Sequence, residues 1–166
     1  MELELYSKTV VFGRNFVVIQ FTGCEYDVAP YTDAYDAIKS VTIEKDGTAY
    51  TSQKNGQTYI LVFHEGLWMG DLMYHSLANP NQLRYDGTTV QDNPFSYSPL
   101  YIMSEDDDFY LPLETKGTNI FANNWTPTSQ ELVECLHITF TSQHPRDPHS
   151  VEFPTTTRSV QEKVEM

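Results

Sequence analysis

Four side chains of types that bind zinc lie close together near the C-terminal end of the sequence. They are Cys135, His137, His144 and His149. Thiolates and imidazoles are the usual zinc ligands, and structural zinc sites hold them at characteristic spacings. The pattern here, Cys-X-His-X6-His-X4-His, matches no standard zinc module. We therefore predict no metal site, and we interpret Cys135 as a buried structural cysteine followed by three exposed histidines.

Paired carboxylates could activate water, as in aspartic peptidases, where two of them share one proton. Each such aspartate sits in an Asp-Thr-Gly or Asp-Ser-Gly turn, and neither triplet occurs in the sequence. We interpret Asp46-Gly47 and Asp86-Gly87 as ordinary turns. The acidic run 104–108 lacks the spaced ligands and the glycine of a calcium loop, so we interpret it as a solvated turn.

Other catalytic chemistry also lacks its residues. There is no Gly-X-Ser-X-Gly motif and no glycine-rich phosphate loop. Cys135 and His137 lie two residues apart on a predicted strand, a spacing that rarely makes a nucleophile–base pair. The sequence therefore predicts no catalytic residue, no cofactor and, on balance, no enzyme.

Composition limits the partners. The 166 residues carry a formal net charge of −13, with no cluster of lysine or arginine, which disfavours nucleic acid and anionic membrane surfaces. No apolar run reaches the about 18 residues that suggest a membrane-spanning helix. The first five residues do not resemble a secretory signal, and the two cysteines are expected to be unpaired. We expect a cytoplasmic protein with a protein or peptide partner.

The pattern of apolar residues predicts a mainly β fold with one or two short helices. Turns at 13–15, Asp46-Gly47 and Asn55-Gly56 predict three successive hairpins, with 23–36 as a loop. The run 58–64 is the most hydrophobic, so we place it at the centre of the sheet. The remaining strands are predicted at 88–90, 100–103, 109–113, 119–122 and 137–141.

Two short helices are predicted from their N-terminal caps. Asn79-Pro80 is typical of a cap followed by the first helical residue, and Gly87 is expected to end this helix. Thr128 and Glu131 form the pattern of a capping box. Residues 1–142 are predicted to be one β-rich domain, and 143–166 a polar C-terminal arm or linker.

From about Gln57 to Phe153, the sequence resembles a segment of retrotransposon polyproteins of the copia or a related type. The matching stretches keep their order and approximate spacing: 59–65 (YILVFHE), 75–84 (HSLANPNQLR), 91–95 (QDNPF), 111–117 (LPLETKG), 127–132 (PTSQEL) with Cys135, and 141–142 leading to Pro148. The resemblance implies a retropepsin-like aspartic peptidase region with a closed or folded β-sheet. Since retropepsins work as dimers, it also implies a possible homodimer.

The resemblance fails at the catalytic motif. In the family, Asp-Ser-Gly-Ala-Asp precedes a strand similar to 9–13, whereas this sequence has Glu4-Leu5-Tyr6-Ser7-Lys8 there. A tyrosine where the motif needs glycine would obstruct the tight turn. The resemblance then implies a degenerate, non-catalytic domain that acts in self-association or in peptide or protein binding.

Two alternatives remain. The chain could be a fragment or subunit of an active aspartic endopeptidase, with the catalytic carboxylate supplied elsewhere. It could instead be an unrelated β-sheet interaction module that uses surface aromatic residues, about half of which we expect to pack in the core. The candidate residues are Tyr31, Tyr35, Trp68, Tyr85, Phe95 and Tyr97.

Overall fold

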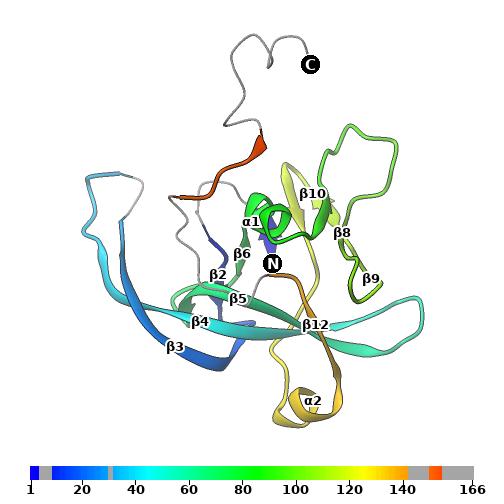
Figure 1. Ribbon diagram of the computed structural model, residues 1–166, viewed down its shortest axis with the longest axis horizontal. Coiled ribbons are helices and arrows are strands. Elements are labelled where there is room, and N and C mark those ends of the chain that lie inside the picture. Colours follow the sequence, from blue (N-terminus) through cyan, green and yellow to red (C-terminus); the bar gives the residue numbers. More distant parts are fainter. Residues whose placement is uncertain (4–8, 30–31, 142–149, 155–166) are drawn as a thin grey trace.

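A computed structural model describes residues 1–3, 9–29, 32–141 and 150–154 (Figure 1). The described chain is mainly β, as predicted. Its strands are β1 (Glu2–Leu3), β2 (Val11–Gly13), β3 (Val17–Val28), β4 (Ile38–Thr51), β5 (Thr58–Gly70), β6 (Leu77–Ala78), β7 (Thr89–Gln91), β8 (Tyr101–Ser104), β9 (Phe109–Pro112), β10 (Glu114–Lys116), β11 (Asn119–Phe121) and β12 (Leu136–Thr139). The helices are α1 (Pro80–Tyr85) and α2 (Ser129–Glu134).

Strand β5 lies at the centre of the larger sheet, as its hydrophobic sequence predicts. One edge of β5 pairs antiparallel with β4 over almost its whole length. The opposite edge pairs parallel with two strands in succession, first β12 and then β2. Residues 60–64 are buried, as expected for a strand that is covered on both faces.

The larger sheet is mixed and open. Its order is β10-β11-β1-β6-β2-β5-β4-β3, with β12 paired to β5, and it ends at β10 and β3. Strands β7, β8 and β9 form a separate small sheet. The sequence led us to expect either a closed or a folded sheet. Because this sheet has two open ends, the described chain does not form a closed sheet.

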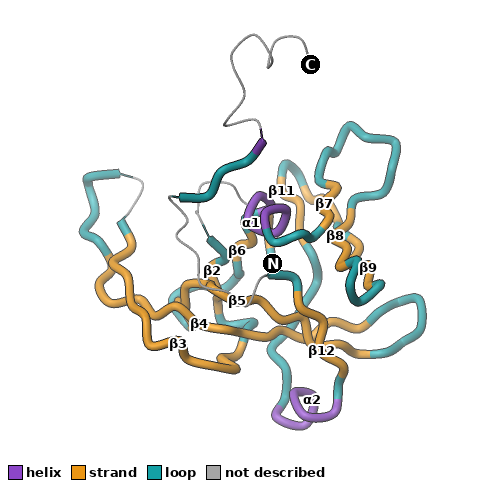
Figure 2. Tube along the Cα trace, viewed as in Figure 1, coloured by secondary structure: helices purple, strands orange, loops and turns teal. Residues whose placement is uncertain are grey.

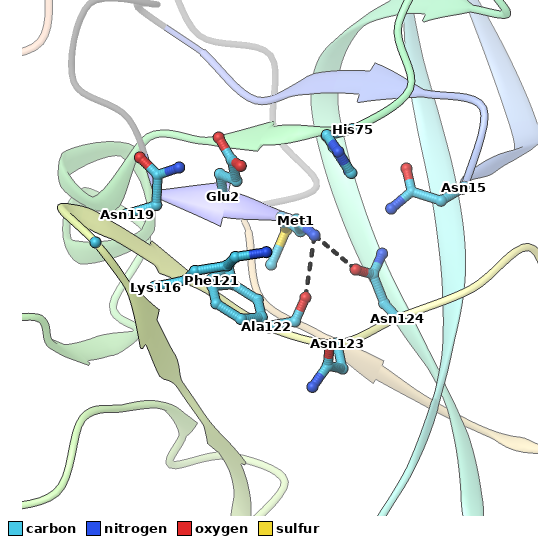
Figure 3. Close-up of a pocket in the computed structure, with 11 residues that line it drawn as sticks. Met1, Glu2, Asn15, His75, Lys116, Asn119, Phe121, Ala122, Asn123 and Asn124 are labelled. Atoms are coloured by element: carbon cyan, nitrogen blue, oxygen red, sulfur yellow. Dashed lines mark hydrogen bonds between the residues drawn. The ribbon is translucent and has the colours of Figure 1, made fainter.

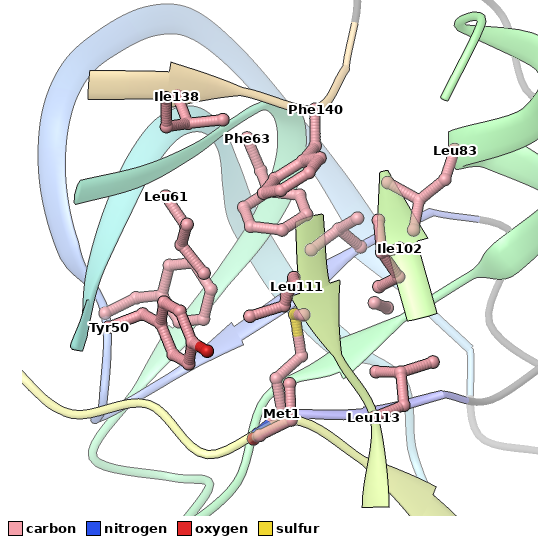
Figure 4. Packing of buried hydrophobic residues seen from close by; sticks show 14 of the residues in the cluster. Met1, Tyr50, Leu61, Phe63, Leu83, Ile102, Leu111, Leu113, Ile138 and Phe140 are labelled. Carbon is pink, nitrogen blue, oxygen red and sulfur yellow. The ribbon is translucent and has the colours of Figure 1, made fainter. Parts of the chain in front are cut away.

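The main hydrophobic core lies between the two sheets (Figure 4). Phe63 of β5 packs on Phe16 and Phe140, with ring centroids 5.7 and 5.5 Å apart. Ile102 and Leu111 contribute from the small sheet and are completely buried. Burying side chains of this size stabilises the fold by roughly 1.5–3 kcal/mol each.

Both predicted helix caps are present. The Asn79 side chain accepts hydrogen bonds from the backbone of Asn81 and Gln82, and Pro80 opens α1. Thr128 and Glu131 form the complete capping box at the start of α2. These local signals were sufficient because a cap involves only residues within one turn. None of the helices in the described part of the chain is long and apolar enough to cross a membrane.

The first two predicted hairpins are wrong. Strand β2 pairs with β5 and β6 rather than with the strand that follows it. Asp46-Gly47 lies inside β4, which pairs with β5 on both sides of this dipeptide, and is not a turn. Gly47 is needed for close packing, because a Cβ there would lie 2.8 Å from Ile19 Cδ1 and 2.9 Å from Ile60 Cγ2. The predicted loop 23–36 is also partly wrong, since β3 continues to Val28.

The later hairpins are confirmed. Asn55-Gly56 turns the chain between β4 and β5, with Gly56 at a positive φ of 71°. The predicted strands at 100–103 and 109–113 correspond to β8 and β9, which pair antiparallel. Most of the proposed tail, 143–149 and 155–166, lies outside the described residues, so the domain boundary at 142 stays a prediction.

We predict that Gly66→Ala destabilises the fold by about 1–3 kcal/mol, because the added Cβ would overlap the ring of buried Phe12. Thermal unfolding of the full chain measures this loss. A Phe12→Leu/Gly66→Ala double variant should be more stable than the sum of the two single losses predicts. A melting temperature of Gly66→Ala equal to that of the wild type would contradict the close packing of β5 on Phe12.

Candidate functional site

The predicted absence of a zinc site concerns Cys135 and the histidines after it. Cys135 is half-buried at the end of α2, and the His137 Nε2 atom lies 2.8 Å from the Leu132 carbonyl oxygen. His144 and His149 lie outside the described residues. No group of three or more potential metal ligands occurs within the described ranges.

The Cys135 thiol lacks the environment of a nucleophile. Desolvation, and then the charges of Glu131 and Glu134, raise its pKa above the usual value. Reactive cysteines have the opposite, electropositive surroundings, which favour the thiolate. The structure therefore offers no support for cysteine chemistry at this position.

The acidic run 104–108 forms a turn in which polar groups hydrogen-bond to one another. The Asp108 N–H donates to the Glu105 carbonyl oxygen at 3.2 Å, and the Ser104 hydroxyl donates to Asp107 Oδ2 at 3.1 Å. Residues 105–108 are exposed between β8 and β9. This geometry agrees with the predicted solvated turn.

Two carboxylates that sequence reasoning did not single out as a pair lie together in β4. Glu44 and Asp46 are two residues apart, and both have an exposed fraction of 0%. A peptidase dyad must contact its substrate, and a peptide does not reach groups without solvent access. The pair is therefore not a peptidase site. Glu4, where the resemblance would place the catalytic motif, lies outside the described residues.

A pocket of about 760 Å³ opens beside β1 and β11 (Figure 3). Met1 is one of its lining residues, and the Met1 nitrogen donates to the Ala122 carbonyl oxygen and to Asn124 Oδ1, at 3.0 and 2.7 Å. Asn124 Nδ2 donates in turn to Thr48 Oγ1. Desolvation lowers the pKa of the Met1 ammonium to about 6.

The lining of this pocket favours a structural role. It consists of Met1, Glu2, Asn15, His75, Lys116, Gly117, Asn119, Phe121, Ala122, Asn123 and Asn124. None of these residues carries a hydroxyl or thiol nucleophile. The bonded amides hold β1 and the segment after β11 together, so we do not assign the pocket a reaction.

A long hairpin projects from the body of the domain, on the left of Figures 1 and 2. We call residues 17–41 the arm, of which 30 and 31 are not described. Its strand β3 is the last strand of the larger sheet and pairs only with β4 among the described strands. One edge of β3 therefore presents backbone N–H and C=O groups without a strand partner.

The arm keeps its shape through β-bulges. Between its pairings with Glu44 and Thr42, β3 contains two extra residues around Gly23, which has a positive φ of 82°. Nearer the tip, Ser40 adopts a positive φ of 56°. The Asp27 carboxylate accepts from the Ser40 N–H at 3.0 Å and from Lys39 Nζ at 3.1 Å. The Ser40 bond and then Lys39 lower the pKa of Asp27.

The arm also exposes large apolar side chains. The exposed fractions are 71% for Phe21, 56% for Tyr26, 71% for Tyr35 and 41% for Ile38. Exposed aromatic side chains beside an unpaired strand edge are typical anchors for protein binding. The arm is the best candidate for a functional site on the described surface.

The aromatic residues proposed from the sequence do not form one patch. Tyr35 lies on the arm, whereas the loop that carries Phe95 and Tyr97 lies on the opposite side of the molecule in Figure 1. Tyr85 packs on Phe153, with ring centroids 6.1 Å apart. Only Trp68 packs against the main core, so the expectation that half would be core residues is wrong for the described ones. Tyr31 is not described.

Sequence reasoning missed Phe21 and Tyr26. Phe21 belonged to the hairpin predicted around the turn at 13–15, and Tyr26 to the predicted loop 23–36. Their exposure follows from the position of β3 at the end of the sheet, which depends on pairings far away in the sequence. The local signal that could have indicated an edge is the sequence Gly23-Cys24-Glu25-Tyr26-Asp27, where glycine and two acids interrupt an apolar strand.

Comparisons with known proteins add no assignment. No family model, no curated protein and no solved structure matches the chain. The resemblance to a retropepsin-like region of a retrotransposon polyprotein therefore stays a prediction.

We predict that Asp27→Ala accelerates amide hydrogen exchange in the arm several-fold, because Ser40 loses the acceptor that holds its left-handed conformation. Asp27→Asn keeps an acceptor oxygen and should have a smaller effect. Asp33→Ala, which removes another exposed carboxylate of the arm, serves as the control. Adding Ser40→Gly to Asp27→Ala should restore protection in part, because glycine adopts this φ without strain. Equal exchange in Asp27→Ala and wild type would refute the role of Asp27.

Proposed function

We propose that this chain is a non-catalytic protein-binding domain whose arm binds an extended, basic segment of a partner protein. The segment would pair with the free edge of β3 as an added strand. The observation that carries this proposal is the edge of β3 that no described strand pairs with, which lies on a projecting hairpin and is flanked by exposed aromatic side chains.

The backbone of the arm suits strand addition. In this mode of binding, main-chain hydrogen bonds supply affinity, and alternate side chains of the added strand supply specificity. The bulge around Gly23 divides β3 into two regular stretches, 17–21 and 25–28. An added segment would pair with one stretch or bend across both, so the bulge limits the length of a continuous pairing.

Charge favours a basic partner. The arm contains four acidic residues, Glu25, Asp27, Asp33 and Asp36, and one lysine, Lys39. The whole chain has a formal net charge of −13. Complementary charge accelerates encounter and selects partners, while like charges repel. A second copy of the same chain would bring two acidic arms together, so the predicted homodimer is the less favoured occupant of this edge.

The exposed aromatic residues supply the apolar part of the interface. Aromatic side chains dominate binding energy when they become fully buried at the centre of an interface. Phe21 and Tyr26 lie on β3 itself, on either side of the bulge. A basic segment with one or two apolar side chains would match both properties of the arm.

The other expectations fit this proposal without being required by it. Both cysteines, Cys24 and Cys135, are free thiols, which is consistent with the expected cytoplasmic location. A degenerate retropepsin-like region would be one origin for a non-catalytic binding domain. Cleavage of a peptide library at pH 5, blocked by a transition-state inhibitor of aspartic peptidases, would instead support the alternative of an active peptidase subunit.

The proposal is tested by selecting peptides from a random library on the full chain and measuring their affinity by calorimetry. We expect selected peptides to be extended and rich in lysine or arginine. Binding should weaken as salt rises, because the exposed charges are screened. Phe21→Ser and Tyr26→Ser should each weaken binding by about tenfold or more.

A matched control is available on the other side of the molecule. Phe95→Ser and Tyr97→Ser remove aromatic side chains that are even more exposed, 91% and 108%, and should leave affinity unchanged. Amide exchange in β3 should slow when a peptide is bound. Equal losses in both pairs of variants, or selection of acidic peptides, would overturn the proposal. Concentration-dependent dimerisation that Phe21→Ser abolishes would assign the edge to a second copy.

A further inference from the structure

The base of the arm is the place where three strands meet around two acidic residues. Glu44 pairs with Phe21 of β3 on one side and Gly66 of β5 on the other. Asp46 pairs with Val18 and Phe63 in the same way. The residues of β4 therefore hold both neighbouring strands at this point, and the arm projects beyond it.

The neighbouring strands are irregular here, whereas β4 has no extra residue between Glu44 and Asp46. Between the partners of Glu44 and Asp46, β5 contains one extra residue, and so does β3. On β5 the irregularity includes Glu65, which adopts a positive φ of 59°. Since β4 alternates without interruption over this stretch, Glu44 and Asp46, two residues apart, project from the same face. The junction thus combines two bulges with two adjacent carboxyl groups.

Neither carboxyl group is accessible or fully satisfied. Both side chains have an exposed fraction of 0%. Glu44 Oε1 accepts a hydrogen bond from the Thr42 hydroxyl at 2.6 Å. Glu44 Oε2 and both carboxylate oxygens of Asp46 have no hydrogen-bond partner among the described residues. Two ionised carboxylates in such a site would repel each other without solvation, whereas one proton would let them hydrogen-bond to each other.

Among the described residues, no surrounding charge neutralises the pair. Lys45 lies between the two acids and, by the alternation of a strand, projects from the opposite face. On β5, burial and then Lys45 lower the pKa of His64 to about 4, so this imidazole is neutral near pH 7. Glu65 is a further acid, and the paired stretch 17–21 of β3 carries no ionisable side chain.

We propose that Glu44 and Asp46 form a proton-operated latch at the base of the arm. With one shared proton the two carboxyl groups bond to each other and the junction of β3, β4 and β5 is closed. Loss of that proton places two buried charges side by side, and the junction opens toward solvent. The latch itself does not depend on the proposed peptide binding, but its regulatory role does.

The direction of the pH effect follows from the shift of the Asp46 pKa. Burial, and then the charge of Glu44, raise the pKa of Asp46 from 3.8 to about 8. A group whose pKa is raised by folding contributes stability that is complete below its ordinary pKa and is lost as pH rises through the folded value. The latch should therefore be closed at pH 6 and open progressively toward and above pH 8.

Two other groups act in the opposite direction on global stability. The lowered pKa of His64, about 4, makes the fold lose stability as pH falls from 6.5 toward 4. The lowered pKa of the Met1 ammonium, about 6, adds a gain between pH 6 and 8. The melting temperature alone would therefore conceal the latch, and a local measurement with a paired variant is needed.

The test is amide hydrogen exchange of β3, β4 and β5 in the full chain between pH 6 and 9, corrected for the intrinsic pH dependence of exchange. In wild type, the opening equilibrium at residues 42–47 should rise by up to tenfold per pH unit near pH 8. Asp46→Asn, which has the same shape and does not ionise, should remove this rise. Glu114→Gln, which removes an exposed carboxylate of β10, should keep it.

A second measurement needs no variant. The side-chain carboxyl carbon of Asp46, followed by NMR in wild type, should titrate far above pH 3.8. Titration of Asp46 below pH 5 would overturn the latch, as would identical exchange profiles in wild type and Asp46→Asn. Protection at pH 8 that is restored by calcium or potassium in wild type, but not in Asp46→Asn, would also overturn it and identify a cation site.

The link to peptide binding is measured separately. If the arm binds its peptide, affinity should change between pH 6 and 9 in wild type and not in Asp46→Asn. A latch that opens without any change in affinity would refute the regulatory role alone. Absence of binding at every pH would refute the proposed function and leave the exchange result to decide the latch.

Discussion

The structure depends on the backbone pairing of β5, which uses both of its edges along most of its length. β4 occupies one edge, and β12 and β2 share the other. A buried strand must have its N–H and C=O groups paired, because an unpaired buried backbone group costs several kcal/mol. Segments from both ends of the described chain are therefore brought to one strand. The main core of phenylalanine side chains then forms on the face of β5 that carries Phe63.

The close packing around β4 and β5 also requires glycine where the backbone touches a neighbouring side chain. Gly66 faces the Phe12 ring, and Gly47 faces Ile19 and Ile60, so neither position has room for a side chain. Gly47 illustrates how a local signal misleads. Asp-Gly is a strong hairpin signal when positive φ is the reason for the glycine, but here the reason is contact with side chains from neighbouring strands.

The sequence predicts the features that depend on neighbouring residues and misses those that depend on distant ones. Both helix caps, the turn at Asn55-Gly56 and the hairpin of β8 and β9 follow from short-range chemistry and are confirmed. The parallel pairing of β2 with β5 was missed because the turn at 13–15 suggested an ordinary hairpin. The candidate site was missed for the same reason: exposure of Phe21 and burial of Asp46 are set by sheet order, which local patterns do not encode.

The composition of the arm helps to decide whether the edge of β3 is only protected against association or also binds a partner. Proteins protect free strand edges with bulges, charges and short strands, and the bulge at Gly23 and the acids Glu25 and Asp27 are devices of this kind. An edge selected only to avoid association would carry polar side chains throughout. Phe21 and Tyr26 are instead exposed at 71% and 56% on that edge. Under the proposed function, apolar anchors beside repulsive charges would disfavour a second acidic copy and accept a basic partner, so that specificity would come from combining attraction with repulsion.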